Sequence, residues 1–374
     1  TGIDANHPDL IKKIYCNPAE SINGIDDDAN GYIDDVSGYS WVDHHDDLQS
    51  HMPVDDHGHG THLAGIIAAE HNQIGISGIH PKAEILPLKV FDSNGKGNQL
   101  NAALAIRYAV DQKVDIINCS WGYYRQTETL KSAINYALDN NVVVVAAVGN
   151  SGVYIQTYPA HFSKVIGVGS INYDSSTLSS FSNWGPMLDI GVDGNNVFST
   201  KPNNNYGQLT GTSQSTAIIT GIISLLKSFK PNLKPDDYLD YLKRTANIVT
   251  KKDVAQPNLQ ALLADFGVLS NRAEEFISYS ADTQTSVSQL LNAPNPISSG
   301  STTFYFQSDQ ADLTAVITLY SLQGKQLKQV SLSTIIGQNS IQMDVSDLLN
   351  GPYIYVLQID SIDQITSGKC QILR

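Results

Sequence analysis

Short hydrophobic runs alternate with helical patterns over roughly the first 265 residues of the chain. Residues 83–91, 114–120, 142–148 and 165–171 are rich in β-branched and aliphatic side chains, as in strands buried on both faces of a parallel sheet. Between them, residues 99–112 and 128–140 carry apolar side chains at helical spacing. This alternation predicts an α/β domain in three layers, with helices on both faces of a mostly parallel sheet.

The pattern changes at about residue 278, where a stretch rich in Ser, Thr, Asn and Pro begins. Strands with alternating apolar residues follow, separated by Gly, Asn and Asp turns, which predicts a small all-β sandwich. We therefore expect an α/β domain at residues 1–265, a linker at 266–292 and the sandwich at 293–374.

Composition narrows the function classes. The net charge of −14 argues against a nucleic-acid binder, which needs a basic face, and suits a secreted protein or one that holds Ca²⁺. The longest apolar run, near residues 142–148, is too short to span a bilayer. Three cysteines lie far apart without a CxxC pair, so a zinc ribbon or disulfide framework is not expected. We expect a monomer.

Three histidines stand close together in the segment DDHGHGTHLAGIIAAE, at positions 57, 59 and 62. They could form a surface cluster or supply zinc ligands. Alternatively, His59 is a catalytic histidine at the start of a buried helix, with Gly60 allowing another segment to approach. For His57 and His62 the sequence favours a surface histidine and a structural histidine.

Two distant stretches support the catalytic interpretation. In TGTSQSTAIITGIISLL, Ser213 follows Gly-Thr at the opening of an apolar helix, where backbone N–H groups are free to face an oxyanion. In VVVVAAVGNSG, Asn150 follows a buried strand and Gly149, which allows close approach to a crevice.

Taken in order, HGTH, GN and GTS resemble the motifs of the subtilisin-like serine proteases, the subtilases. Residues 158–191, 115–122 and 86–97 are also similar to segments of that family. The resemblance covers roughly residues 1–265 and implies that Ser213 is the nucleophile and His59 the general base and acid. It implies that Asn150 and the Ser213 N–H form the oxyanion hole, with no cofactor for catalysis.

The resemblance also implies where an extended protein or peptide substrate binds. One wall of the primary pocket would be Ser120, Trp121 and Gly122, and the opposite wall would be Gly95, Lys96 and Gly97, with Gly149 beside the oxyanion hole. Trp121 stands where the family often has a smaller aliphatic residue, so it should narrow or reshape the pocket.

The first residues, TGIDANHPDL, fit the family's pattern immediately after its catalytic aspartate. The resemblance therefore places the third triad member directly before Thr1, at the end of the first buried strand. We expect the parent protein to be a working secreted endopeptidase, and a chain lacking that carboxylate to be impaired. The alternative is an inactive peptide-binding or surface protein on the same fold.

A dense acidic loop occupies residues 23–39. Its candidate ligands open like an EF-hand loop, although Ser37 stands where the bidentate Glu would be. They are Asp26, Asp28, Asn30, Asp34 and Asp35. The sequence leaves open a structural Ca²⁺ site and a solvated turn.

The C-terminal region resembles the sorting domain of the type IX secretion system of Bacteroidetes, on the marks PNP at 294–296, LNGPY at 349–353 and the terminal Gly368-Lys369. This resemblance implies export across the outer membrane, to the cell surface or beyond, with the secretion machinery as partner. A generic immunoglobulin-like or carbohydrate-binding sandwich would show the same alternation.

Overall fold

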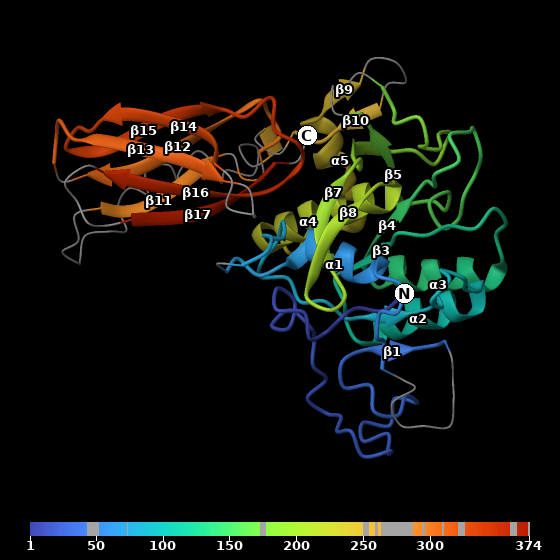
Figure 1. Ribbon diagram of the computed structural model, residues 1–374. Helices are drawn as coiled ribbons and strands as arrows, with labels where there is room; N and C mark the ends of the chain where they lie inside the picture. The colour runs from blue at the N-terminus through green and yellow to red at the C-terminus, as the bar shows by residue number, and fades with distance from the viewer. Residues whose placement is uncertain are drawn as a thin grey trace. The chain divides into compact units, whose positions relative to one another are not determined.

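The computed structural model describes residues 1–42, 52–72, 74–172, 177–249, 254–258, 261–262, 287–293, 295, 297–308, 310–320, 326–359 and 365–372. They form two compact units, the first spanning residues 1–71 and 78–262 and the second holding the strands near the C-terminus (Figure 1). Most of the segment expected as a linker lies outside the described residues, but its last part forms the strand β11 (Val287–Ala293). Five residues of β11 pair with β12 of the sandwich, with a register shift between Ser288 and Leu291.

A six-stranded sheet in the order β3-β4-β5-β6-β10-β9 forms the centre of the first unit. Five strands are parallel and β9 is antiparallel to β10. The bounds are β3 (Ile116–Cys119), β4 (Val143–Ala147), β5 (Ile166–Ile171), β6 (Ile190–Asp193), β9 (Asn247–Val249) and β10 (Val254–Gln256). Two small sheets accompany it: the parallel pair β1 (Tyr39–Ser40) and β2 (Leu88–Lys89), and the hairpin β7 (Val197–Lys201) and β8 (Asn205–Leu209).

Helices cover both faces of this sheet, which confirms the predicted three layers (Figure 1). On one face, Val144, Ala146 and Val148 join the core formed with α2 (Gln99–Asp111) and α3 (Glu128–Asp139). Because side chains alternate along a strand, the intervening residues of β4 face the other side, where α4 (Thr212–Phe229) packs against β3 to β6. The remaining helices are α1 (His59–Ala68), which packs on α4, and α5 (Pro235–Arg244).

The predicted strand at 83–91 is shorter than its hydrophobic run. Regular pairing is confined to Leu88–Lys89, with an isolated bridge from Ile85 to Ile14. Pro87 has no N–H to donate to a ladder, and its carbonyl instead accepts from Tyr39 at 3.2 Å. Pairing therefore begins only after the proline.

The second unit is the predicted β-sandwich. Its two antiparallel sheets have the orders β11-β12-β15 and β14-β13-β16-β17. Along β12 the alternate residues Phe304 and Phe306 point into a core shared with Ile317, Leu357 and Ile372, as the sequence alternation requires. The strand bounds are β12 (Ser301–Ser308), β13 (Thr314–Tyr320), β14 (Gln326–Ser333), β15 (Gly337–Asp344), β16 (Gly351–Ile359) and β17 (Ile365–Ile372).

Candidate active site

The first turn of α1 is fixed by Asp55. Its carboxylate accepts hydrogen bonds from the N–H groups of His57, Gly58 and Thr61, at 3.1, 2.7 and 2.9 Å, and from the Thr61 hydroxyl at 2.6 Å. Burial opposes the charge on Asp55, but these hydrogen bonds outweigh it and lower the pKa of the carboxyl group. A buried carboxylate thus caps the helix N-terminus and holds His59 at the helix start. The sequence analysis missed Asp55, although an Asp just before a helix is a capping signal.

Gly60 lets the N-terminal segment reach this turn. A Cβ at Gly60 would lie 2.0 Å from the carbonyl oxygen of Gly2, and the Gly60 N–H donates to Thr1 Oγ1 at 2.9 Å. A second bond links the Asp4 N–H to Thr61 Oγ1 at 2.9 Å. Residues 1–4 therefore lie directly against the helix start that carries His59.

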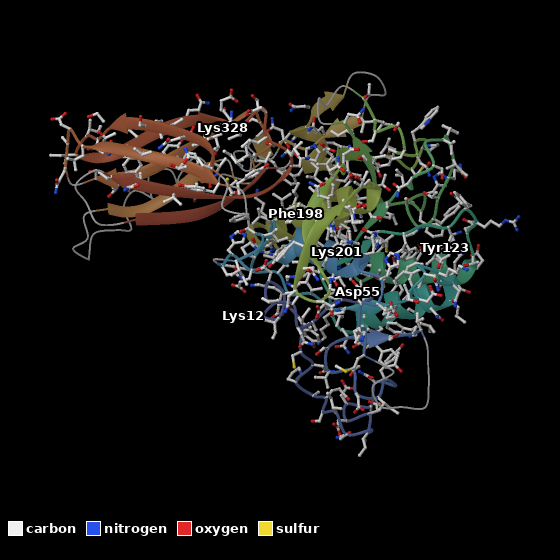
Figure 2. All side chains as sticks on the ribbon, viewed as in Figure 1. Lys12, Asp55, Tyr123, Phe198, Lys201 and Lys328 are labelled. Carbon is white, nitrogen blue, oxygen red and sulfur yellow. The ribbon has the colours of Figure 1, made fainter. Side chains whose placement is uncertain are left out.

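His59 is neutral near pH 7, because burial lowers its pKa to about 4. The charge of Lys201 also lowers this pKa, whereas the charge of Asp55 opposes the shift. Figure 2 labels Asp55 and Lys201 in this region of the first unit. A neutral imidazole is the form that accepts a proton from a hydroxyl group.

The other two histidines are placed differently. His57 is exposed, and its ring centroid lies 6.2 Å from that of His59. His62 is fully buried, with Nε2 at 3.0 Å from the carbonyl of Val197 and 3.1 Å from that of Gly207. These contacts direct the His62 ring into the β7–β8 hairpin, so the three histidines do not share one centre.

Ser213 lies in the first turn of α4 and is 9% exposed. Its hydroxyl donates to the carbonyl of Ser120 at 3.1 Å, and the Ser120 hydroxyl donates to the carbonyl of Ser213 at 2.9 Å. This reciprocal pair joins the start of α4 to the segment that follows β3. The candidate nucleophile is therefore fixed beside one predicted substrate strand.

Asn150 is hydrogen-bonded to Thr212, the residue that precedes Ser213. The Thr212 N–H and hydroxyl donate to Asn150 Oδ1 at 2.8 and 2.9 Å. Asn183 holds the turn that contains Asn150. It accepts from the N–H of Ser151 at 2.9 Å and donates to the carbonyl of Val148 at 3.0 Å. The amide oxygen of Asn150 is thus occupied, which leaves Nδ2 as a donor for a ligand.

The two predicted substrate segments meet through an aromatic contact. Phe91 and Trp121 have ring centroids 6.0 Å apart, and Tyr123 lies 5.7 Å from Trp121 on the other side. The segment with Gly95 and Lys96 is a tight turn, in which the Asp92 N–H donates to the Lys96 carbonyl and the Gly95 N–H to the Asp92 carbonyl, both at 2.9 Å. Three predicted members remain. Gly97 forms an isolated β-bridge with Phe91, and Gly122 lies against Thr157. The Gly149 N–H donates to Thr212 Oγ1 at 3.2 Å.

A cavity of about 910 Å³ opens between β2 and β3. Residues 82–88 line one side and residues 113–118 the other, and the α1 side chains Leu63, Ala64 and Ile67 line it as well. Thr1, Gly2, His59, Gly95, Ser120 and Trp121 lie along the same cavity. It therefore joins the predicted site to a space beside the edge of the central sheet.

The acidic loop divides into two parts. The ligand oxygens of Glu20, Asp26 and Asp28 all lie within 4.8 Å of one another, the one such acidic cluster found in the described ranges. Asp34 instead accepts from the N–H groups of Asn23 and Gly24, and Asp35 from the Tyr108 hydroxyl at 2.6 Å. Asn30 bridges the parts: its N–H donates to Asp26 at 3.0 Å and Asp28 at 3.1 Å, and its Nδ2 donates to Asp35 at 2.9 Å.

The first unit is an α/β domain in which His59 and Ser213 each lie in the first turn of a helix. Comparison with known proteins agrees: residues 1–273 match the subtilase family, and residues 293–372 match the secretion system C-terminal sorting domain. The chain belongs to the subtilase family. Its C-terminal domain indicates export, to the cell surface or the medium. In the part of the chain that the structure describes, no helix has the length and apolar character to cross a membrane.

Three named proteases match this chain over 61–62% of its length. Thermitase of Thermoactinomyces vulgaris is 37% identical over 229 residues, which are 61% of this chain and 72% of thermitase. The major intracellular serine protease of Bacillus subtilis is 38% identical over 236 residues, 62% of this chain and 67% of that protein. The thermophilic serine proteinase of Bacillus sp. strain AK1 is 38% identical, but the match spans half of its length.

Solved structures show the same fold. A cold adapted subtilisin-like serine proteinase superposes with a TM-score of 0.57 at 25% identity, covering 68% of this chain and 85% of its own. The prenylagaramide maturation protease PagA gives a TM-score of 0.54 at 27% identity, covering 71% and 90%.

Proposed function

We propose that this protein is an exported serine endopeptidase that hydrolyses peptide bonds through an acyl-enzyme intermediate. The observation that carries the proposal is the convergence of Ser213, Ser120 and Asn150, linked by the hydrogen bonds Ser213–Ser120 and Thr212–Asn150. A serine hydroxyl is a weak nucleophile until a base removes its proton, and neutral His59 is the candidate base.

The reaction runs in two halves. Ser213 Oγ attacks the scissile carbonyl carbon while its proton passes to His59, and Asn150 Nδ2 and the Ser213 N–H stabilise the oxyanion. The C–N bond then breaks, and His59 gives the proton to the leaving amine, which leaves an ester on Ser213. Water attacks that ester, again losing its proton to His59, and the acid product leaves with the serine restored.

The third member of the triad would be an aspartate directly before Thr1. Two features support this position. The Gly60 N–H donates to Thr1 Oγ1 at 2.9 Å, so Thr1 lies against the helix turn that begins with His59. Thr1 and Gly2 also line the cavity, and within the described ranges β2 pairs only with β1 and β3 only with β4. A parallel strand inserted between β2 and β3 would fill the cavity and end beside His59.

Substrate would bind as an extended strand between residues 95–97 and 120–122, its backbone paired and its side chains in the pockets between them. The contact between Phe91 and Trp121 gives one of these pockets an aromatic wall. Bulky substrate side chains compete with Trp121 for that space, so the pocket beside it favours smaller ones.

The acidic loop fits a structural Ca²⁺. Glu20 is 7% exposed, and its Oε2 is buried without a hydrogen-bond partner, next to Asp26 and Asp28. Burial raises the pKa of Glu20, partly offset by a hydrogen bond from the Asp28 N–H at 3.0 Å. Glu20 thereby supplies the carboxylate that Ser37 does not, and an oxygen-rich group of this kind suits Ca²⁺. Catalysis itself uses no metal.

For the whole chain we propose a catalytic domain at residues 1–265, a linker at 266–292 whose last residues join the sandwich as β11, and a sorting domain at 293–374. The partners are protein or peptide substrates and the type IX secretion machinery of a Bacteroidetes host, and the protein acts as a monomer. The test is hydrolysis of denatured casein by the full-length protein and its loss in Ser213→Ala. If the full-length protein does not hydrolyse casein, the alternative of an inactive peptide-binding protein on the same fold is favoured.

A further inference from the structure

Gln214, the residue after the candidate nucleophile, carries an unexplained polar group. Its side chain is 1% exposed, and its buried Nε2 has no hydrogen-bond partner among the described residues. A buried amide donor without an acceptor is costly, and folded proteins rarely retain one unless it has another use. The position next to Ser213 suggests where that use lies.

The Gln214 amide shares a space with the amide of Asn150. A Cβ at Gly211 would lie 3.1 Å from Asn150 Nδ2 and 3.2 Å from Gln214 Oε1. The two carboxamides therefore both lie beside the Cα of Gly211, two residues before Ser213. Thr212 fixes the orientation of Asn150, whereas no described hydrogen bond holds the Gln214 Nε2.

A half-turn about the last side-chain torsion of Gln214 exchanges Oε1 and Nε2, and this torsion has a broad, two-fold profile. After that rotation Nε2 faces the same space as Asn150 Nδ2. We propose that Gln214 is a further catalytic residue, which turns its amide and donates a hydrogen bond to the oxyanion beside Asn150. The proposal rests on the proposed peptidase function.

This arrangement stabilises the transition state selectively. In the free protein the Gln214 N–H is unpaired, and a neutral substrate carbonyl attracts it less than the negative oxygen formed on attack. An interaction that strengthens only as charge develops raises kcat and leaves KM nearly unchanged.

The test uses the full-length protein with Gln214→Met, which keeps the length of the side chain but has no N–H. We expect kcat to fall about tenfold, with KM within twofold of wild type. A peptide boronic acid forms an adduct that carries a tetrahedral oxyanion. The affinity of Gln214→Met for this compound should fall by about the same factor as its kcat. Binding of an intact peptide should be the same in Ser213→Ala and in Ser213→Ala/Gln214→Met. An unchanged kcat, or an equal loss of intact-peptide binding, would overturn the proposal.

A measurement on the wild-type protein covers the case in which Gln214→Met does not fold. The side-chain ¹⁵N–¹H signals of Gln214 should shift downfield when the boronic acid binds, and unchanged signals would overturn the proposal. If wild type itself neither hydrolyses peptides nor binds the boronic acid, the peptidase function fails. If wild type is active and Gln214→Met equals it, only the role of Gln214 fails.

Discussion

Thr212 holds the amide of Asn150 by two hydrogen bonds, from its N–H and its hydroxyl to Oδ1, at 2.8 and 2.9 Å. With the oxygen occupied, the Nδ2 donor is oriented before any substrate arrives. Preorganised donors avoid the reorganisation that water would require as charge develops. Thr212, which precedes the proposed nucleophile, thus positions the proposed oxyanion donor.

Replacing Asn150 with Ala should lower kcat by about 10²–10³, the loss that removing this donor causes in subtilisin, itself a subtilase. Thr212→Val keeps the shape of the side chain and removes only one of the two bonds, so its loss should be clearly smaller. Steady-state kinetics on a chromogenic peptide with the full-length protein measures both. An Asn150→Ala protein with wild-type kcat would remove Asn150 from the oxyanion hole.

Stability should fall on acidification because of His62. Burial lowers the pKa of this histidine to about 4, below its ordinary value of 6.5, so between these pH values the unfolded chain binds a proton that the folded chain does not. The stabilisation is complete above pH 6.5 and is lost progressively as the pH falls from 6.5 to about 4. The slope from this group reaches at most about 1.4 kcal/mol per pH unit.

Urea unfolding of wild type and His62→Gln between pH 4 and pH 7 measures this contribution. The variant lacks the titrating ring, so its stability should depend less steeply on pH, whatever its stability at pH 7. Equal slopes would show that His62 titrates alike in the folded and unfolded chains.

Calcium should stabilise the first unit through Glu20, Asp26 and Asp28. Ca²⁺ at a hundred times its Kd adds about 2.7 kcal/mol, which corresponds to several degrees in Tm. Differential scanning calorimetry with Ca²⁺ and with EGTA measures the shift. Glu20→Gln should abolish it, while the exposed Glu84→Gln retains it; a shift that survives Glu20→Gln places the ion elsewhere.

A strand between β2 and β3 should protect backbone amides. In a chain extended by the residues encoded before Thr1, the alternate amides of β3 that face the cavity should exchange with solvent at least tenfold more slowly than in the chain starting at Thr1. The amides of β5 serve as control, because β5 is already paired on both sides. Equal exchange at β3 in both chains would contradict an inserted strand.

Much of this architecture could be predicted from local sequence. The β4 run is hydrophobic throughout because both of its faces are buried, and β12 alternates because one face meets solvent. The short β7–β8 hairpin and the strand β11 carry weaker patterns, since their pairing depends on partners distant in sequence. Asp55 and Glu20 were missed for a similar reason: their roles depend on backbone groups and carboxylates that only the folded chain brings near.

The most direct test of the account is labelling by a fluorophosphonate, which reacts with a serine activated by a neighbouring base. The full-length protein, including the residues before Thr1, is treated with the probe at pH 7.5, and the modified peptide is identified by mass spectrometry. We expect one adduct, on Ser213, that disappears in both Ser213→Ala and His59→Ala. A folded wild-type protein that carries no adduct on Ser213 would contradict it.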